Sequence, residues 1–132
     1  MPNFGYAWLA FALALAVHVA DEAAHDFLSV YNPAVRAIRA RLPFLPLPTF
    51  GFPAWLGGLI AGIVLLLLLS PLAFAADYNV RIIAWPLAAI VGIGNGLLHI
   101  AASLFKSRWM PGVMSAPLLI AAAVWLLAAA AR

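Results

Sequence analysis

The sequence contains no cysteine and very few charged residues. The lack of cysteine excludes disulfides, thiolate metal sites, iron–sulfur clusters and a cysteine nucleophile. Charged residues make up 8% of the 132 residues and hydrophobic residues 67%, whereas a typical soluble domain has roughly 25% charged residues. A soluble fold of this length cannot bury so much apolar surface. The composition therefore predicts a single domain surrounded by lipid, and the few scattered basic residues favour no nucleic-acid partner.

Four apolar stretches are each long enough to cross a membrane, which takes about 20 residues. They cover approximately residues 4–30, 53–76, 82–105 and 113–131. We therefore expect an all-α fold, an integral membrane bundle of four transmembrane helices that occupies residues 1–132. Several tryptophans near the expected helix ends are typical of an aromatic belt at the membrane interface: Trp8, Trp55, Trp85 and Trp109.

The connections between these stretches predict the orientation of the chain. The first connection, residues 31–52, begins with Asn32-Pro33, a helix-start signal, and continues with spaced arginines, which favours a short interfacial helix. With four spans, the first and third connections lie on the same side of the membrane. Together they contain Arg36, Arg39, Arg41, Lys106 and Arg108, whereas the other side has only Arg81 and Arg132. The positive-inside rule then places the first group in the cytoplasm and both termini outside.

Four ionisable residues share one face of the first apolar stretch. At 100° per residue, His18, Asp21, Glu22 and His25 fall within an arc of roughly 100°. His18 and Glu22 lie well inside the expected span, where a carboxylate is costly and usually marks function. Asp26 lies nearer the cytoplasmic end, where solvation explains it.

A second polar pair lies on the third stretch, where Asn95 and His99 are four residues apart on one helical face. The first and third helices run in the same direction, so His18 and Asn95 should lie at similar depths, about 21 Å from the outer surface. The pair is surrounded by small residues that allow close helix approach: Gly92, Gly94 and Gly96. This packing could occur within a chain or between chains, which leaves a homo-oligomer open.

The two polar sets together suit more than one kind of chemistry. In the first interpretation, His18, Glu22, His25 and His99 bind one divalent ion, zinc or iron, and Glu22, Asp21 and Asn95 act on a substrate. In the second, the same residues form a metal-free acid–base pair that isomerises or hydrolyses a lipid-soluble molecule. A third interpretation, without an enzyme, is a proton or ion relay through the bundle. The expected partners are membrane lipids and an apolar small-molecule substrate.

These motifs resemble a bacterial family of integral membrane proteins named for its His-x-x-Glu-Glu motif. Here the motif reads His18-Val19-Ala20-Asp21-Glu22, with Asp at the first acidic position. The resemblance continues, in order, in Gly94-Asn95-x-x-x-His99 and Trp109-Met110-Pro111-Gly112. It implies a membrane enzyme of unknown activity in the inner (cytoplasmic) membrane of a bacterium. The implied site residues are His18, Asp21, Glu22, Asn95 and His99.

Overall fold

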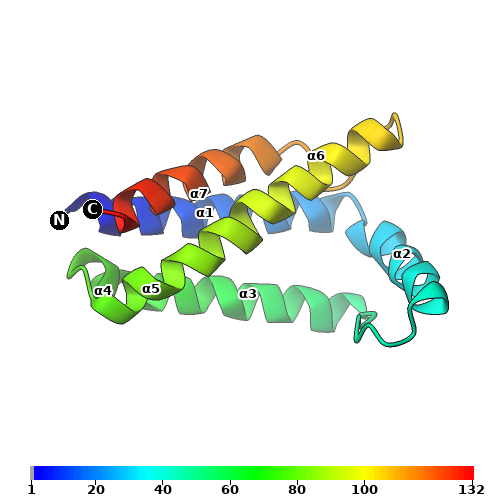
Figure 1. Cartoon of the computed structure of the whole chain (residues 1–132), viewed down its shortest axis with the longest axis horizontal. Coiled ribbons are helices and arrows are strands. Elements are labelled where there is room, and N and C mark those ends of the chain that lie inside the picture. The colour runs from blue at the N-terminus through cyan, green and yellow to red at the C-terminus, as the bar shows by residue number, and fades with distance from the viewer. Residues whose placement is uncertain (1) are drawn as a thin grey trace.

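The computed structural model describes residues 2–132, and this part of the chain is helical without strands. Its elements, in order, are α1 (Pro2–Ala24), α2 (Phe27–Arg41), α3 (Phe52–Leu68), α4 (Ser70–Phe74), α5 (Tyr78–Pro86), the π-helix η1 (Leu87–Gly94), α6 (Asn95–Phe105) and α7 (Ala116–Ala130). The long helices form an elongated bundle, and α2 lies across one end of it (Figure 1).

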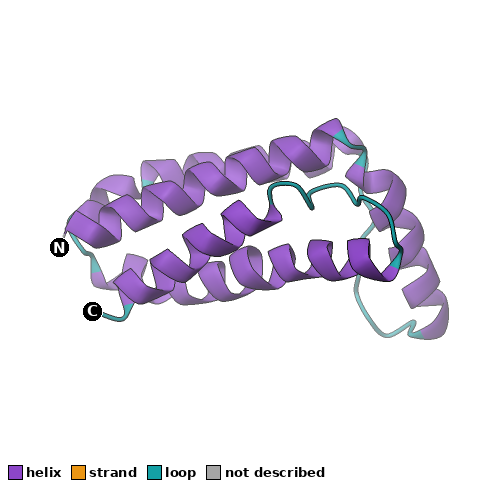
Figure 2. Cartoon of the chain, turned by 90° about the horizontal axis from the view of Figure 1, so that it is seen from above, coloured by secondary structure: helices purple, strands orange, loops and turns teal. Residues whose placement is uncertain are grey.

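The bundle is organised around α1, which packs against α7, α3 and α4. The segments α5, η1 and α6 form one continuous rod that crosses the bundle obliquely and packs on α7 (Figure 1). Both chain ends lie at the same end of the bundle, opposite α2 (Figure 2). This arrangement brings the C-terminal part of α1 beside α6, as the matching depths of their polar residues predict.

The end of the bundle near the termini has a dry aromatic and aliphatic core. Phe4, Trp8 and Phe11 of α1 are almost completely buried, together with Leu119 and Leu126 of α7. The Trp8 indole N–H donates a hydrogen bond to the Leu66 carbonyl oxygen at 2.8 Å. The expectation that Trp8 belongs to an interfacial belt is therefore wrong. The indole finds a backbone acceptor inside the bundle and does not need the polar interface.

The first helix ends at Ala24, earlier than the expected boundary at residue 30. Asp26 adopts a left-handed conformation with φ 53°, which Asp tolerates better than most residues. The chain turns there, and α2 begins at Phe27, before the predicted start at Asn32-Pro33, so that Pro33 lies inside α2. Asn32 instead holds the following loop, because its side chain exchanges two hydrogen bonds with the backbone of Phe50.

Two helical segments are long and apolar enough to cross a membrane, residues Asn3–Ala24 and Tyr78–Phe105. The other two predicted spans are shorter helices. The second breaks at Leu69, between α3 and α4, and the fourth begins as a helix only at Ala116. Proline follows each of these points at Pro71 and Pro117, where it suits the first turn of a new helix.

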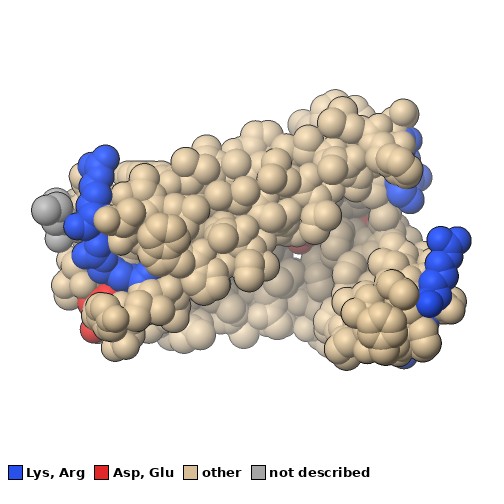
Figure 3. All heavy atoms as spheres, in the orientation of Figure 1, with Lys and Arg blue, Asp and Glu red and all other residues tan. Residues whose placement is uncertain are grey.

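The surface is apolar along the bundle and charged at its ends. Lys and Arg gather at the two ends of the long axis, and the band between them carries almost no charge on the face shown (Figure 3). Large apolar side chains are exposed on the helices of the bundle, among them Leu13, Leu68, Ile90, Leu98 and Leu118. Exposed apolar surface of this extent is typical of a membrane or protein–protein interaction surface.

Candidate functional site

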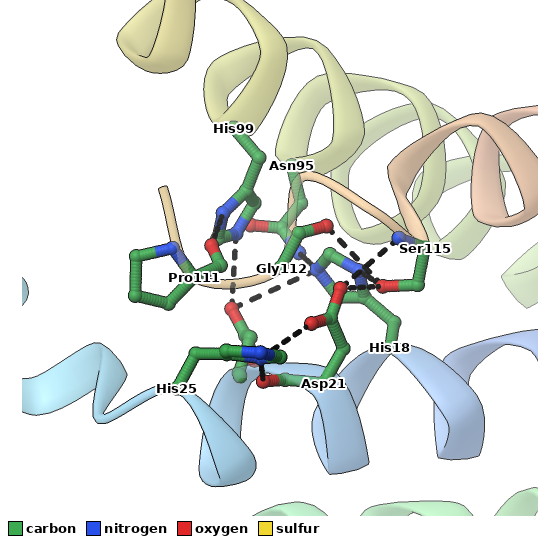
Figure 4. A network of polar contacts seen from close by, with 9 residues as sticks. His18, Asp21, His25, Asn95, His99, Pro111, Gly112 and Ser115 are labelled. Atoms are coloured by element: carbon green, nitrogen blue, oxygen red, sulfur yellow. Dashed lines mark hydrogen bonds and ion pairs between the residues drawn. The ribbon is translucent and has the colours of Figure 1, made fainter. Parts of the chain in front are cut away.

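Three ionisable side chains meet inside the bundle, between α1 and α6. His18 is fully buried, and Glu22 and His99 are 5% and 6% exposed. The Glu22 Oε1 atom lies 2.9 Å from His99 Nε2 and 3.6 Å from His18 Nε2. The two imidazole rings stand edge to face, with centroids 4.8 Å apart (Figure 4). One carboxylate therefore lies between two imidazoles that come from different helices.

The orientation of His18 is set by Ser115 and Asp21. Ser115 Oγ lies 2.7 Å from Asp21 Oδ2, and Asp21 Oδ2 also accepts the Ser115 backbone N–H at 3.0 Å. Because an ionised carboxylate only accepts hydrogen bonds, the Ser115 hydroxyl must donate to Asp21. The same hydroxyl oxygen can then accept from His18 Nδ1, 2.9 Å away. This chain of contacts places the proton of neutral His18 on Nδ1 and leaves a lone pair on Nε2.

The Asp21 carboxylate also suits the start of α7. Ser115 is the N-cap residue of this helix, and its backbone N–H points at the carboxylate. A negative charge at a helix N-terminus is favourable because unpaired N–H groups and the helix dipole meet there. Asp21 therefore ties α1 to α7 and orients His18 at the same time.

The orientation of His99 is set by the loop between α6 and α7. His99 Nδ1 lies within hydrogen-bond distance of the Pro111 carbonyl oxygen. A carbonyl only accepts, so this nitrogen carries a proton, and Nε2 faces Glu22. The next residue, Gly112, has φ 83°, and a Cβ there would lie 2.8 Å from the His99 ring and 3.0 Å from Glu22 Cγ. Glycine is thus required at Gly112 both by its backbone conformation and by the space that the site occupies.

Asn95 closes the set from the start of α6. Its Nδ2 atom lies 3.1 Å from His18 Nε2, and because that nitrogen carries a lone pair, the amide donates to it. Asn95 directly follows η1, a π-helical segment of 8 residues. π-Helical turns are rare and occur frequently at functional sites. Asn95 and His99 thus lie within the first two turns of α6 after this segment.

The arrangement provides three potential metal ligands. One ligand atom from each of His18, Glu22 and His99 can be chosen so that all three lie within 4.8 Å of one another. Zinc–nitrogen and zinc–oxygen bonds of about 2.0–2.2 Å require ligands roughly 3.4 Å apart in a tetrahedral site. The observed separations from Glu22 of 2.9 and 3.6 Å bracket this value. Two histidines with one glutamate form a ligand set that leaves room for water or substrate.

His25 lies apart from these three residues. Its side chain is 61% exposed, and its Nδ1 lies 2.9 Å from Asp21 Oδ1. The contact of His25 is thus with Asp21 rather than with Glu22 or His99. Asp26, at the turn after α1, is exposed. The structure therefore brings His18, Glu22, Asn95 and His99 together, with Asp21 behind His18 and His25 at the outside.

Two further residues that orient the histidines of the site lie in the loop from residue 106 to residue 115. Ser115 links Asp21 to His18, and the Pro111 carbonyl orients His99. The sequence offers a signal for the second in Pro111-Gly112, a helix break next to the third stretch. It offers none for Ser115, because a lone serine before an apolar stretch is common. Ser103 holds this loop in place, since its hydroxyl donates to the Arg108 carbonyl and accepts from the Met110 N–H.

Comparison with protein families identifies the family of this chain. A family model described as "Protein of unknown function with HXXEE motif" matches residues 8–126. The chain belongs to the HXXEE-motif family. In this HXXEE protein the first acidic position is Asp21, which contacts Ser115 and His25, whereas Glu22 at the second position contacts both buried histidines. The shorter Asp side chain thus occupies the outer position. No curated protein and no solved structure matches the chain.

Proposed function

We propose that this HXXEE protein is an integral membrane enzyme that uses a metal ion held by His18, Glu22 and His99 to act on a lipid-soluble small molecule. The observation that carries the proposal is the convergence of the two Nε2 atoms on one Glu22 carboxylate oxygen, at 2.9 and 3.6 Å. Each histidine has its other nitrogen bound to an acceptor, Ser115 or the Pro111 carbonyl. Metal-binding histidines almost always have such an outer partner, which fixes the ring and its tautomer.

The bound ion would supply Lewis acidity and an activated water molecule. The other residues have supporting roles that follow from their contacts. Asn95 offers its amide to the reacting region, and Asp21 positions His18 through Ser115. Glu22 has two carboxylate oxygens, of which only Oε1 contacts the histidines, so the other can hold a proton or a substrate group.

The membrane assignment rests on the apolar band between two charged ends. We propose four membrane-crossing segments: α1, α3 with α4, the rod from α5 to α6, and α7. The end with α2 and the loop after α6 would face the cytoplasm, because it contains most of the basic residues. The natural chain has no cysteine, so single cysteines at Arg39 and Arg132 report topology directly. An impermeant maleimide added outside spheroplasts should label Arg132→Cys but not Arg39→Cys, and the reverse pattern would contradict this orientation.

Elemental analysis of the purified protein tests the metal site. We expect one zinc or iron ion per chain, lost in His18→Ala and His99→Ala. The matched control is His25→Ala, which removes an exposed histidine outside the three ligands and should keep the ion. Each binding event should also release a proton, because one proton must lie between His99 Nε2 and Glu22 Oε1 when no metal is there. A folded wild-type protein that takes up no metal would contradict the proposal.

The same contact supports a second candidate, a metal-free acid–base site. His99 and Glu22 share one proton at 2.9 Å, which is the arrangement that a general acid–base pair needs. A related possibility is proton conduction, since contacts connect exposed His25 through Asp21, Ser115 and His18 to Glu22. If the protein conducts protons, a membrane potential that is negative inside should acidify the lumen of liposomes containing it. Glu22→Gln should abolish this acidification. Liposomes that remain tight would exclude conduction and leave the enzyme candidates.

A further inference from the structure

A groove on the side of the bundle leads to the inner site. It lies between α1, the start of α2, α3, η1 and α6 and has a volume of about 670 Å³, within the range of roughly 300–1,000 Å³ for small-molecule sites. Ile90 and Leu98, each 69% exposed, lie at its mouth, whereas Glu22 is only 5% exposed. The surface is visibly hollowed beside α2, with acidic atoms inside the hollow (Figure 3). The groove therefore connects the apolar surface with the buried carboxylate.

The walls of the groove are apolar and partly aromatic. Phe27, Trp55 and Leu59 line it opposite η1 and α6. The rings of Phe27 and Trp55 are stacked, with centroids 5.7 Å apart and planes 27° apart. Neither Lys nor Arg is among its lining residues. Such walls suit a hydrocarbon body and offer no partner for an anionic headgroup.

Two hydrogen-bond acceptors face this groove without a protein donor. Asn95 uses its Nδ2 for His18, and Glu22 uses its Oε1 for His99. Within residues 3–132, no buried side-chain nitrogen or oxygen lacks a hydrogen-bond partner. The remaining oxygens, Asn95 Oδ1 and Glu22 Oε2, have no such partner and must therefore be open to the groove, which both residues line. A ligand that fills it should present a hydrogen-bond donor to at least one of these two oxygens.

We propose that the groove binds a long-chain alcohol that enters sideways from the membrane, with its hydroxyl donating to Asn95 Oδ1 next to Glu22 Oε2 and its alkyl chain along Phe27 and Trp55. A hydroxyl donates one hydrogen bond and keeps lone pairs for a further partner at the site. A fatty acid would place a second carboxylate beside Glu22, and no Lys or Arg lines the groove to balance it. The inference deepens the proposed function, on which it rests, by naming the class of substrate.

Photolabelling tests this inference on the full chain in liposomes. The probe is hexadecanol with a diazirine on its alkyl chain, and hexadecane with the same diazirine is the reference for unspecific lipid contact. The alcohol probe should label residues of the groove selectively, and excess unlabelled hexadecanol should suppress that labelling, whereas hexadecanoic acid should not. Equal labelling of the groove by both probes, or equal competition by the acid, would overturn the inference.

Adjacent leucines on α6 provide a matched pair of variants. Leu98 lines the groove, whereas Leu97 is exposed on the same helix outside it. Leu98→Trp should reduce alcohol-specific labelling about tenfold, as for a loss of about 1.4 kcal/mol, and Leu97→Trp should leave it unchanged. Ile90→Trp narrows the mouth from η1 and keeps the test valid if Leu98→Trp does not fold. Labelling that survives in both folded groove variants would overturn the inference.

A separate variant tests whether Asn95 Oδ1 accepts a hydrogen bond from the alcohol. Asn95→Leu removes the amide oxygen and should weaken competition by hexadecanol about fivefold, since a hydrogen bond contributes about 1 kcal/mol, without changing labelling by the hexadecane probe. An unchanged competition curve would contradict the assigned hydroxyl position.

Metal content measured on the same samples separates the two proposals. Alcohol-selective labelling of a metal-free protein would refute the metal enzyme and uphold the groove. A metal-loaded protein without alcohol selectivity would refute the groove alone.

Discussion

The two halves of α1 face the same neighbour, α7, with opposite chemistry. The half from Phe4 to Leu15 packs against α7 and α4 through aromatic rings, alanines and leucines. The half from His18 to Ala24 faces the start of α7 and α6 through imidazoles and carboxylates. Both halves are well buried where they face these neighbours. Within residues 3–132, no buried side-chain nitrogen or oxygen, in the polar half or elsewhere, lacks a hydrogen-bond partner.

This difference indicates that the apolar half of α1 stabilises the bundle, whereas the polar half belongs to the candidate site that the bundle positions. In the lipid environment that we propose, helix association would depend on close packing, because the surrounding tails are as apolar as the side chains. The dry half provides that packing. Buried ionisable groups are costly even when paired, so the polar half contributes little stability for its size. We therefore expect mutations in the dry half to change stability and mutations in the polar half to change mainly ligand binding.

The largest effect on stability should come from Trp8→Ala in the dry half. It opens a cavity and removes the hydrogen bond to the Leu66 carbonyl, and large-to-small core changes of this kind cost about 3–5 kcal/mol. Denaturant unfolding in detergent micelles measures the change. Metal affinity in the folded fraction should remain that of the wild type. A loss below about 1 kcal/mol would show that the dry half does not carry the stability.

Gly92→Ala should have the next largest effect on stability. A Cβ at Gly92 would lie 2.3 Å from the Ala123 Cβ and 2.9 Å from the Phe11 ring. Forcing a methyl group into such a contact costs about 1–3 kcal/mol. Gly62→Ala is the matched control, because nothing lies within 4 Å of its Cβ position. Equal unfolding curves for the two variants would contradict close packing between η1 and α7.

Ser115→Ala should affect binding more than stability. It leaves Asp21 and His18 without their shared hydroxyl, and the loss of an outer partner lowers metal affinity about 10–100-fold. Competition with a chelator of known affinity measures this change. Ser70→Ala is the control in the dry half, since it removes a hydroxyl that only contacts the Leu66 carbonyl. Unchanged affinity in Ser115→Ala would refute the role of Ser115 in orienting His18.

The smallest effect should come from His25→Ala. The exposed side chain forms its polar contacts with Asp21, and surface substitutions usually change stability by less than about 0.5 kcal/mol. Unfolding and metal content should both match the wild type. A loss of metal in this variant would move the boundary of the polar site outward to include His25.

Much of the candidate site could be predicted from the sequence because it follows from helical periodicity. His18 and Glu22 share a face of α1, and Asn95 and His99 share a face of α6, so their grouping needs only two parallel helices at matching depth. The role of Ser115 could not be predicted, because it depends on where the loop from residue 106 to residue 115 returns. The helix end at Ala24 was also missed, since an apolar run does not reveal a single left-handed residue such as Asp26.

The sequence by itself determined the apolar character of the chain, its helical class, its family and the residues of the polar faces. The family follows from the ordered motifs and the others from composition and short-range spacing, none of which depends on the path of the chain. Only the tertiary structure decided that Glu22 lies between the two histidines, that Asp21 acts through Ser115, and that His25 stays outside. Those outcomes depend on distances between side chains far apart in the sequence, which the packing of α1, η1, α6 and α7 sets. The same packing leaves open the groove beside Asn95, which no pattern in the sequence indicates.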